Sequence, residues 1–506
     1  MRQNICRLIT FFVAVSMLAS CRGIPLFSKR VDQSAFHVAD ANIVEKGEET
    51  APAVVPVEMV RVGLLVPLTG ASAKTGEILR NAALMSLFEI GGQKLILQFY
   101  DTEGTPEGAR KAAKLAISQG VELIIGPLYS KNVRAVRPVT HDADVGVITF
   151  STDPSNLGDG VYTIGTLTSQ QVEHIVRFAC DKGYKRLAIV SQDNATGDIV
   201  SMASKAATNA CGGMITKAAF YEPNGDFQAA VSPIMPKLLE DLETEREEEV
   251  KRLERAREQV AQGSPVLMKN DETGEMEERH MSSEQLQALI DALKEKELQR
   301  DPFEFDAILV SEEGSRLRSL GALLSYYDVP SDVKVLGTSL WADSRPAREP
   351  ALIGGWFSHL PSDGFNIFSK RYADIYGEKP PRIASQAYDA VALAAILAES
   401  GGFSYENLTT VSGFKGVDGL FRLLPNGLSE RGLQVLGVEK KGFVTLSPAP
   451  EVFETVPVFS PDVYIKDFRH SPDLVTVLET PENSETASAA ENASDQQSAA
   501  ESVQNH

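Results

Sequence analysis

The sequence is poor in cysteine, histidine and basic residues, and each shortage excludes a class of protein. Four cysteines in 506 residues are too few for a disulfide-stapled small domain or a four-thiolate zinc site in the mature chain. The seven histidines are scattered without the spacing of metal ligands, and we expect neither a metal nor a cofactor. Lysine and arginine total 49 against 69 aspartates and glutamates, a formal net charge of −20. General nucleic-acid binding is therefore not expected.

Catalytic motifs are missing as well. The chain contains no phosphate-binding G-x-x-x-x-G-K-[ST] run, no H-E-x-x-H zinc motif and no G-x-S-x-G nucleophile elbow. Carboxylates are abundant, but a nucleophile, a base and a group that orients the base cannot be assigned together. We expect no catalytic residues, and hence a protein that is not an enzyme.

The first residues have the pattern of a secretory signal. Two arginines lie in Met1–Arg7, and an apolar run of about a dozen residues follows, too short to span a bilayer. Leu18-Ala19-Ser20-Cys21 resembles the lipobox of bacterial lipoproteins, so we expect removal of residues 1–20 and lipidation of Cys21. An ordinary cleaved signal with an incidental cysteine is the alternative. Arg22 stands where an aspartate would favour inner-membrane retention, so the resemblance implies a periplasmic protein anchored to the outer membrane.

Both ends of the mature chain lack the pattern of a folded core. Residues 21–57 have no sustained periodicity and contain an extended proline-bearing run, which predicts a tether. Residues 446–471 are interpreted as a C-terminal extension. Residues 472–506 carry seven acidic side chains and no lysine or arginine, which predicts a disordered acidic tail.

Between these ends, short β-rich runs alternate with helical segments, which predicts an α/β fold with parallel sheets. The predicted strands are 60–66, 95–100, 123–125 and 146–149, then 187–191, 215–221, 306–310 and 333–336. The predicted helices are 77–89, 106–118, 131–141 and 170–181. The strands up to residue 149 and the strands from residue 187 onward form two groups, each with its helices and each about the size of one domain. We therefore predict two doubly wound parallel-sheet lobes joined by a hinge.

One stretch interrupts the alternation. Residues 237–262 are densely charged with apolar residues at helical spacing, a Gly263-Ser264-Pro265 stop follows, and helical spacing resumes at 283–299. This pattern predicts an inserted helical hairpin over 237–300. It fits either a solvated extension without a partner or a docking arm for another protein.

Several runs resemble the type I periplasmic binding protein superfamily, of the leucine/isoleucine/valine-binding kind. These runs are Val62–Gly70, Tyr100–Ala109, Gly120–Ser130 and Ser385–Val391, and Gly416–Phe421 with 431–438 fits the closing strands of that fold. The resemblance implies a first lobe over 58–165, to which 380–445 returns, and a second lobe over 166–379. Its solute receptors serve permeases, which implies a small amino-acid-like ligand in an interlobe cleft and a role in ABC transport. The alternative is an outer-membrane lipoprotein activator of a penicillin-binding protein, with a peptidoglycan synthase as partner.

Candidate ligand-binding residues follow the predicted strands, where helix N-termini present free backbone N–H groups. The resemblance aligns Ser130 and Thr152 with the hydroxyls that hold a ligand carboxylate, although serine and threonine are also common N-caps there. The further hydroxyl candidates are Ser72, Thr75, Ser151 and Thr196. For a ligand ammonium group the second lobe offers Glu312 and Glu313, of which Glu313 is equally suited to the first turn of a helix.

Cys180 and Cys211 lie near the ends of two helices that flank one predicted strand. An oxidising periplasm permits a disulfide between them, and two buried free thiols are the alternative.

Overall fold

The computed structural model describes residues 58–453, except 93, 263–265, 270–275 and 280. The predicted signal peptide, the tether with Cys21, residues 454–471 of the extension and the acidic tail lie outside the described residues. In the part of the chain that is described, every helix is too short or too polar to cross a bilayer.

The first sheet is parallel, with its five strands in the order β2-β1-β3-β4-β5. Its strands are β1 (Val60–Val66), β2 (Leu95–Asp101), β3 (Leu123–Ile125), β4 (Gly146–Thr149) and β5 (Val161–Thr163), and its connecting helices are α1 (Ala73–Ile90), α2 (Pro106–Ser118) and α3 (Ser130–Asp142). Leu64 of β1 packs into the core with α1, and Leu65 packs into the core with α2 and α3. Helices cover both faces of this sheet, and accordingly β3 and residues 62–66 of β1 are continuous buried runs.

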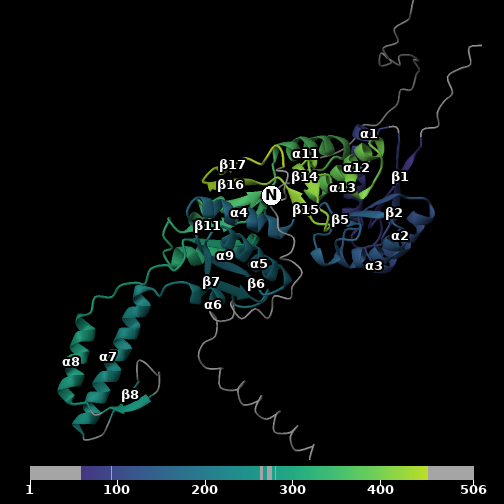
Figure 1. The fold of residues 1–506 in the computed structure, drawn as a ribbon. Coiled ribbons are helices and arrows are strands. Elements are labelled where there is room, and N and C mark those ends of the chain that lie inside the picture. Colours follow the sequence, from purple (N-terminus) through teal and green to yellow (C-terminus); the bar gives the residue numbers. More distant parts are fainter. Residues whose placement is uncertain (1–57, 93, 263–265, 270–275, 280, 454–506) are drawn as a thin grey trace, which may run out of the picture. The chain divides into compact units, whose positions relative to one another are not determined.

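Helices from late in the chain complete the first lobe. α12 (Ile383–Glu399) lies beside α1, where alanines permit a close approach (Figure 1). α11 (Asp363–Tyr376) joins the same core, and its Phe368 ring lies 5.4 Å from that of Tyr388. α13 (Tyr405–Leu408) and a small antiparallel sheet of β13 (Phe414–Gly416), β14 (Gly419–Leu423) and β15 (Ser429–Arg431) follow.

The second sheet has seven strands in the order β17-β16-β12-β11-β10-β6-β7. They are β6 (Arg186–Gln192), β7 (Met214–Tyr221), β10 (Ala307–Val310), β11 (Lys334–Gly337), β12 (Trp356–His359), β16 (Gln434–Glu439) and β17 (Gly442–Ser447). The helices of this lobe are α4 (Thr168–Asp181), α5 (Ala195–Ala210), α6 (Phe227–Val231), α9 (Gly314–Tyr326) and α10 (Trp341–Ser344). The second lobe also has the short 3-10 turns η2 (Ser232–Ile234), η3 (Pro346–Arg348) and η4 (Pro350–Leu352), whereas η1 (Pro154–Asn156) lies between β4 and β5 of the first lobe. The predicted α/β class with two wound lobes is confirmed.

Two predicted lobe boundaries are wrong. The second lobe was expected to run to residue 379, but α11 packs into the first lobe because Phe368 and Tyr372 are buried against α12. The segment returning to the first lobe was expected to reach residue 445, but β16 and β17 belong to the second sheet. There β16 pairs antiparallel with β12, which places Leu436 opposite Phe357.

The insertion contains the two predicted helices, α7 (Leu239–Ala261) and α8 (Ser283–Glu295), which lie side by side (Figure 1). They enclose a small core of their own, in which Leu253, Leu286 and Ile290 are buried. Ser282 caps α8 by accepting from the Gln285 N–H group at 3.2 Å. An antiparallel pair that was not predicted, β8 (Val266–Lys269) and β9 (Met276–Arg279), connects them.

Candidate ligand-binding site

A cavity of about 400 Å³ lies where the β3–α3 and β4–η1 loops meet the first turns of α4 and α5. Its hydroxyl-bearing lining residues are Ser130, Ser151, Thr152, Thr168, Ser169 and Thr196. Leu167, Ile199 and Leu428 supply apolar surface. Among the described residues that line the cavity, Asp153 alone carries a formal charge. A wall that combines hydroxyl groups, one carboxylate and apolar side chains is suited to a small polar molecule.

Asp153 sits in a closed set of hydrogen bonds at one end of this cavity. One carboxylate oxygen, Oδ2, accepts from the Ser130 hydroxyl and from Asn156 Nδ2, the latter at 2.9 Å. The other, Oδ1, accepts from the Ser155 N–H group at 3.0 Å and from the Ser155 hydroxyl at 2.7 Å. Burial raises the pKa of Asp153, but the bonds from Ser130 and Ser155 and the charge of Arg134 outweigh it, so the pKa lies below its ordinary value. Asp153 is therefore ionised at neutral pH.

The other predicted hydroxyls in the cavity differ in their surroundings. The Ser151 side chain is buried, and its Oγ accepts from the Asp153 N–H group at 3.4 Å. Thr152 and Thr196 are exposed. Asn194, rather than Thr196, caps α5 by accepting from the N–H groups of Thr196 and Gly197. The first turn of α4 has no side-chain cap because its N-cap residue is Leu167.

The other four predicted residues lie outside this cavity. Ser72, near Thr75 at the start of α1, accepts a 2.7 Å hydrogen bond from the Tyr129 hydroxyl. Glu312 turns inward beside Tyr221 of β7 and is only 4 % exposed. Burial raises the pKa of Glu312 above its ordinary value, although Tyr221, Gln192 and Arg316 oppose the shift. Glu313 lines a separate cavity, of about 460 Å³, with Arg318, Arg345 and Arg348. The expected ammonium site at Glu312 and Glu313 therefore does not face Ser130.

Three lining residues, Asp153, Thr168 and Ser169, were not predicted. Asp153 stands before Pro154, the pattern of a capping residue, and its side chain does cap η1. That local signal did not reveal the contact with Ser130, which is 23 positions away. Thr168 and Ser169 were missed because the helix was expected to begin at Gln170, two residues later than α4 does.

The chain crosses between the lobes after β5, after β12 and after β15, and side chains tie these crossings together. The Ser429 hydroxyl donates to the Gly165 carbonyl at 2.6 Å, and Gln434 Nε2 donates to the Leu360 carbonyl at 3.1 Å. Arg431 Nη2 donates to the carbonyl of Ile164. These bonds hold the crossings in register with one another.

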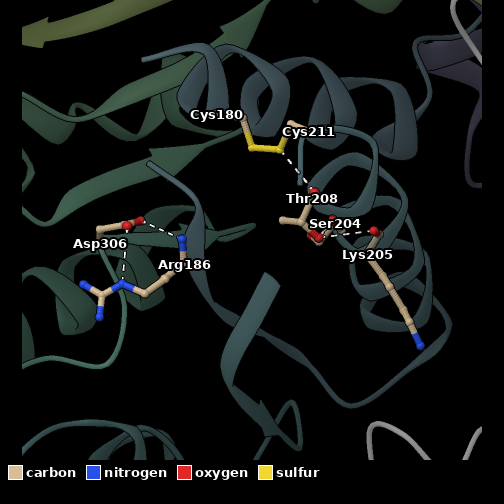
Figure 2. The surroundings of a disulfide bond; sticks show 7 residues. All are labelled: Cys180, Arg186, Ser204, Lys205, Thr208, Cys211 and Asp306. Atoms are coloured by element: carbon tan, nitrogen blue, oxygen red, sulfur yellow. Dashed lines mark hydrogen bonds and ion pairs between the residues drawn. A yellow bond between two sulfur atoms is a disulfide. The ribbon is translucent and has the colours of Figure 1, made fainter. Parts of the chain in front are cut away.

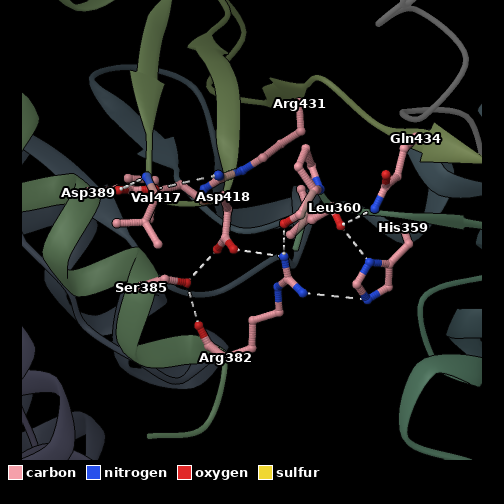
Figure 3. Close-up of polar contacts among 11 residues, drawn as sticks. His359, Leu360, Arg382, Ser385, Asp389, Val417, Asp418, Arg431 and Gln434 are labelled. Atoms are coloured by element: carbon pink, nitrogen blue, oxygen red, sulfur yellow. Dashed lines mark hydrogen bonds and ion pairs between the residues drawn. The ribbon is translucent and has the colours of Figure 1, made fainter. Parts of the chain in front are cut away.

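A buried charge network stands beside the crossings (Figure 3) and comprises Arg382, Ser385, Asp389, Asp418 and Arg431. Arg431 Nη1 lies 3.9 Å from Asp389 Oδ2, and both side chains are fully buried. Arg382 Nη2 donates to Asp418 Oδ1 at 2.9 Å, and the Ser385 hydroxyl donates to the other oxygen of Asp418. Burial raises the pKa of Asp389 to about 7, although Arg431 opposes the shift. Burial likewise lowers the pKa of Arg431.

Cys180 near the end of α4 and Cys211 at the C-cap of α5 are joined by a disulfide (Figure 2). The bond closes a loop with a sequence separation of 31 residues around β6. Arg186, at the start of β6, forms an ion pair of 3.5 Å with Asp306. In the part of the chain that the structure describes, no group of three or more His, Cys, Asp or Glu side chains is arranged to hold a metal ion.

Comparison with known proteins gives matches in sequence and in fold. Residues 59–237 match the family "Periplasmic binding protein". A Leu/Ile/Val-binding protein, BraC3, from Rhizobium johnstonii is 30% identical over 166 residues, which cover 30% of this chain and 45% of that protein. The Leu/Ile/Val-binding protein homolog 6 of Brucella abortus is 25% identical over 170 residues, which cover 32% of this chain and 44% of that protein. The chain thus spans less than half of the curated relatives it matches.

Two solved structures share the fold across most of the chain. One, described as a branched-chain amino acid ABC transporter from Rhodospirillum rubrum, has a TM-score of 0.56 at 16% identity and covers 77% of this chain and 100% of that one. An ABC transporter substrate-binding protein from Sphaerobacter thermophilus has a TM-score of 0.52 at 16% identity and covers 79% of this chain and 98% of that one. Residues 59–237 thus match the periplasmic binding protein family, and the described part of the chain shares the fold of these solved structures.

Proposed function

We propose that this protein is a periplasmic solute-binding protein that holds a small, polar, amino-acid-like ligand in the cavity lined by Ser130 and Thr196. The observation that carries the proposal is that residues of both lobes line this one cavity. A ligand that touches both lobes favours the closed arrangement over an open one, because its affinity for the two differs. Delivery of the ligand to the permease of an ABC transporter follows from this role. The fold and the relatives support binding rather than catalysis.

Thermal-shift screening tests the proposal. The full mature chain, prepared without its lipid, is heated in the presence of single amino acids and other small polar solutes. One chemical class should raise the melting temperature by several degrees, because a ligand at about 100 times its Kd stabilises the folded state by about 2.7 kcal/mol. A flat response across the panel would count against solute binding.

Membrane anchoring through a lipid on Cys21 is a separate part of the proposal. It is supported by the lipobox-like Leu18–Cys21 segment. Mass spectrometry of mature protein should find a diacylglyceryl-modified N-terminal cysteine, and density-gradient fractionation should recover the protein with the outer membrane. An unmodified Cys21 in mature material would rule the anchor out.

The α7–α8 hairpin supports a second candidate, an activator that contacts a peptidoglycan synthase. This hairpin has its own buried core, and Leu239 and Leu289 on its helices are 48% and 40% exposed. Deleting residues 237–300 distinguishes the two functions. A solute receptor should keep its ligand-induced thermal shift after the deletion, whereas an activator that docks through the hairpin should lose co-purification of its penicillin-binding protein.

A further inference from the structure

A second cavity, in the second lobe, is positively charged although the chain as a whole is strongly acidic. It has a volume of about 460 Å³ and lies where the β10–α9 loop meets α10 and η3. Its charged lining residues are Arg318, Arg345, Arg348, Glu313 and Asp343. Three arginines against two carboxylates leave one net positive charge, whereas the chain carries −20. This cavity shares no lining residue with the cavity proposed for the solute, so the two are separate.

The three arginines have no partner of their own. In the part of the chain that the structure describes, none of their guanidinium groups forms a hydrogen bond, an ion pair or a ring contact. Other arginines of this lobe are engaged: Arg186 forms an ion pair with Asp306, and Arg316 donates to the Pro223 carbonyl at 2.6 Å. Guanidinium groups that share a cavity repel one another unless an anion lies among them. The cluster therefore favours the binding of an anion.

The backbone that carries these arginines is fixed by local contacts. The Gly314 N–H group, at the start of α9, donates to the Ser344 hydroxyl at 3.0 Å, and that hydroxyl donates to the Leu340 carbonyl at 2.9 Å. Arg345 has a left-handed backbone conformation with a φ of 52°, which is unfavourable for a residue with a Cβ atom. Arg345 is the N-cap of η3 and Arg348 is its last residue. Because these walls are held in place before a ligand arrives, less entropy is lost on binding.

The donors of this cavity indicate the kind of anion. A guanidinium group presents a planar fork that matches two oxygens of a carboxylate or a phosphate. A phosphate monoester has three terminal oxygens and a charge of about −1.5 to −2, so three arginines suit it better than they suit a carboxylate with two oxygens. Glu313 and Asp343 are exposed on the same wall and can accept hydrogen bonds from hydroxyl groups. A cavity of about 460 Å³ has room for the organic part of a small ester as well as for its phosphate group.

We propose that this cavity is a second binding site, which holds a small phosphorylated polyol. Arg318, Arg345 and Arg348 bind its phosphate group, and Glu313 and Asp343 accept from its hydroxyl groups. This inference goes beyond the proposed solute-binding function and does not depend on it.

Calorimetry at low ionic strength tests the inference on the full mature chain, prepared without its lipid. Glycerol 3-phosphate is the probe. Glycerate, which has a carboxylate in place of the phosphate group, and uncharged glycerol are its matched controls. Glycerol 3-phosphate should bind with a Kd of about 1 mM or tighter, glycerate should bind at least about tenfold more weakly, and glycerol should give no signal. Binding should weaken as salt is added, because the three arginines are exposed.

Substitutions then assign the binding to this cavity. Arg318→Gln, Arg345→Gln and Arg348→Gln should each weaken the binding of glycerol 3-phosphate by about fivefold or more, because each removes a charged hydrogen-bond donor. These side chains are exposed, so the variants should melt within about a degree or two of wild type. Arg110→Gln is the matched control, since Arg110 is an exposed arginine on α2 outside the cavity, and it should leave the affinity unchanged.

Three results would overturn this inference and leave solute binding standing. They are a wild type that does not bind glycerol 3-phosphate, a wild type that binds glycerate as tightly, and arginine variants of the cavity that keep the wild-type affinity. Thr196→Trp, which places a large ring in the solute cavity, should not change the affinity for glycerol 3-phosphate. A loss of affinity in that variant, with none in the arginine variants, would assign the probe to the solute cavity and contradict a second site.

Discussion

Replacing Arg431 with leucine should destabilise the protein strongly, because the substitution leaves the buried Asp389 carboxylate without its cation. The Arg431 side chain is 0% exposed, as is that of Asp389, 3.9 Å away. Leucine also removes the hydrogen bond to the Ile164 carbonyl and the packing of the guanidinium over the Phe421 ring, 5.0 Å away. Breaking a buried ion pair by removing one partner costs about 3–5 kcal/mol. We expect Arg431→Leu to lower the free energy of unfolding by that amount at pH 8.

The loss of unfolding free energy caused by Arg431→Leu should be larger at high pH than at low pH. In the folded wild type the pKa of Asp389 is raised to about 7, above its ordinary value of 3.8, so ionising this group opposes folding. Its stabilising contribution is present below pH 3.8 and is lost as the pH rises through 7. Without the positive charge of Arg431, the protonated form of Asp389 is favoured further. The cost of Arg431→Leu should therefore be smaller at pH 5 than at pH 8.

Urea unfolding of the full mature chain measures this cost. The control is Arg137→Leu, which breaks the partly exposed ion pair with Asp159 and should cost at most about 1 kcal/mol. Adding Asp389→Leu to Arg431→Leu should recover part of the loss, because the uncompensated charge is then removed. A cost for Arg431→Leu no larger than that of the control, or a double variant whose losses simply add, would refute this account of the network.

Three further predictions concern the disulfide, a buried histidine and the hairpin. Replacing Cys180 and Cys211 with serine opens a loop with a separation of 31 residues and should cost about 3.5 kcal/mol in thermal unfolding, a difference that disappears when the wild type is reduced. Burial lowers the pKa of His174 to about 4, so the wild type should lose stability as the pH falls from about 6.5 towards 4, and His174→Gln should reduce that loss in urea titrations at pH 7, 6 and 5. Ser282→Ala removes the cap of α8 and should cost that helix about 1 kcal/mol, seen as roughly fivefold faster hydrogen exchange in α8 with no change in α12.

The first lobe was predicted from the sequence more closely than the rest, for physical reasons. β3 and residues 62–66 of β1 are buried on both faces, and α2 starts at Pro106 after the capping residue Thr105, a strong local signal. The strands β12, β13 and β17 escaped prediction because each has six or fewer residues, and β17 is mostly exposed. The position of α11 was missed because only the tertiary contact of Phe368 with Tyr388 assigns that helix to the first lobe.

The lining of the candidate cavity was predicted in part. Hydroxyls at the ends of strands are visible in a sequence, and Ser130, Ser151, Thr152 and Thr196 do line one cavity. The charge of that cavity was not predictable from the sequence. The residues around Asp153 predict only a helix cap, and its hydrogen bond with Ser130 joins two loops that are separate in the sequence. The inward turn of Glu312 depends on Tyr221 of a different strand, which spacing along the chain does not reveal.

Filling the cavity tests the central claim of solute binding most directly. Thr196→Trp adds a large ring at an exposed first-turn position of α5 that lines the cavity, and its backbone N–H can still donate to Asn194. Thr244→Trp makes the same change on the exposed surface of α7. The solute found by screening is titrated into each full-length variant in a calorimeter. Binding should be at least tenfold weaker in Thr196→Trp and unchanged in Thr244→Trp, and equal affinity in the two variants would contradict a ligand site in this cavity.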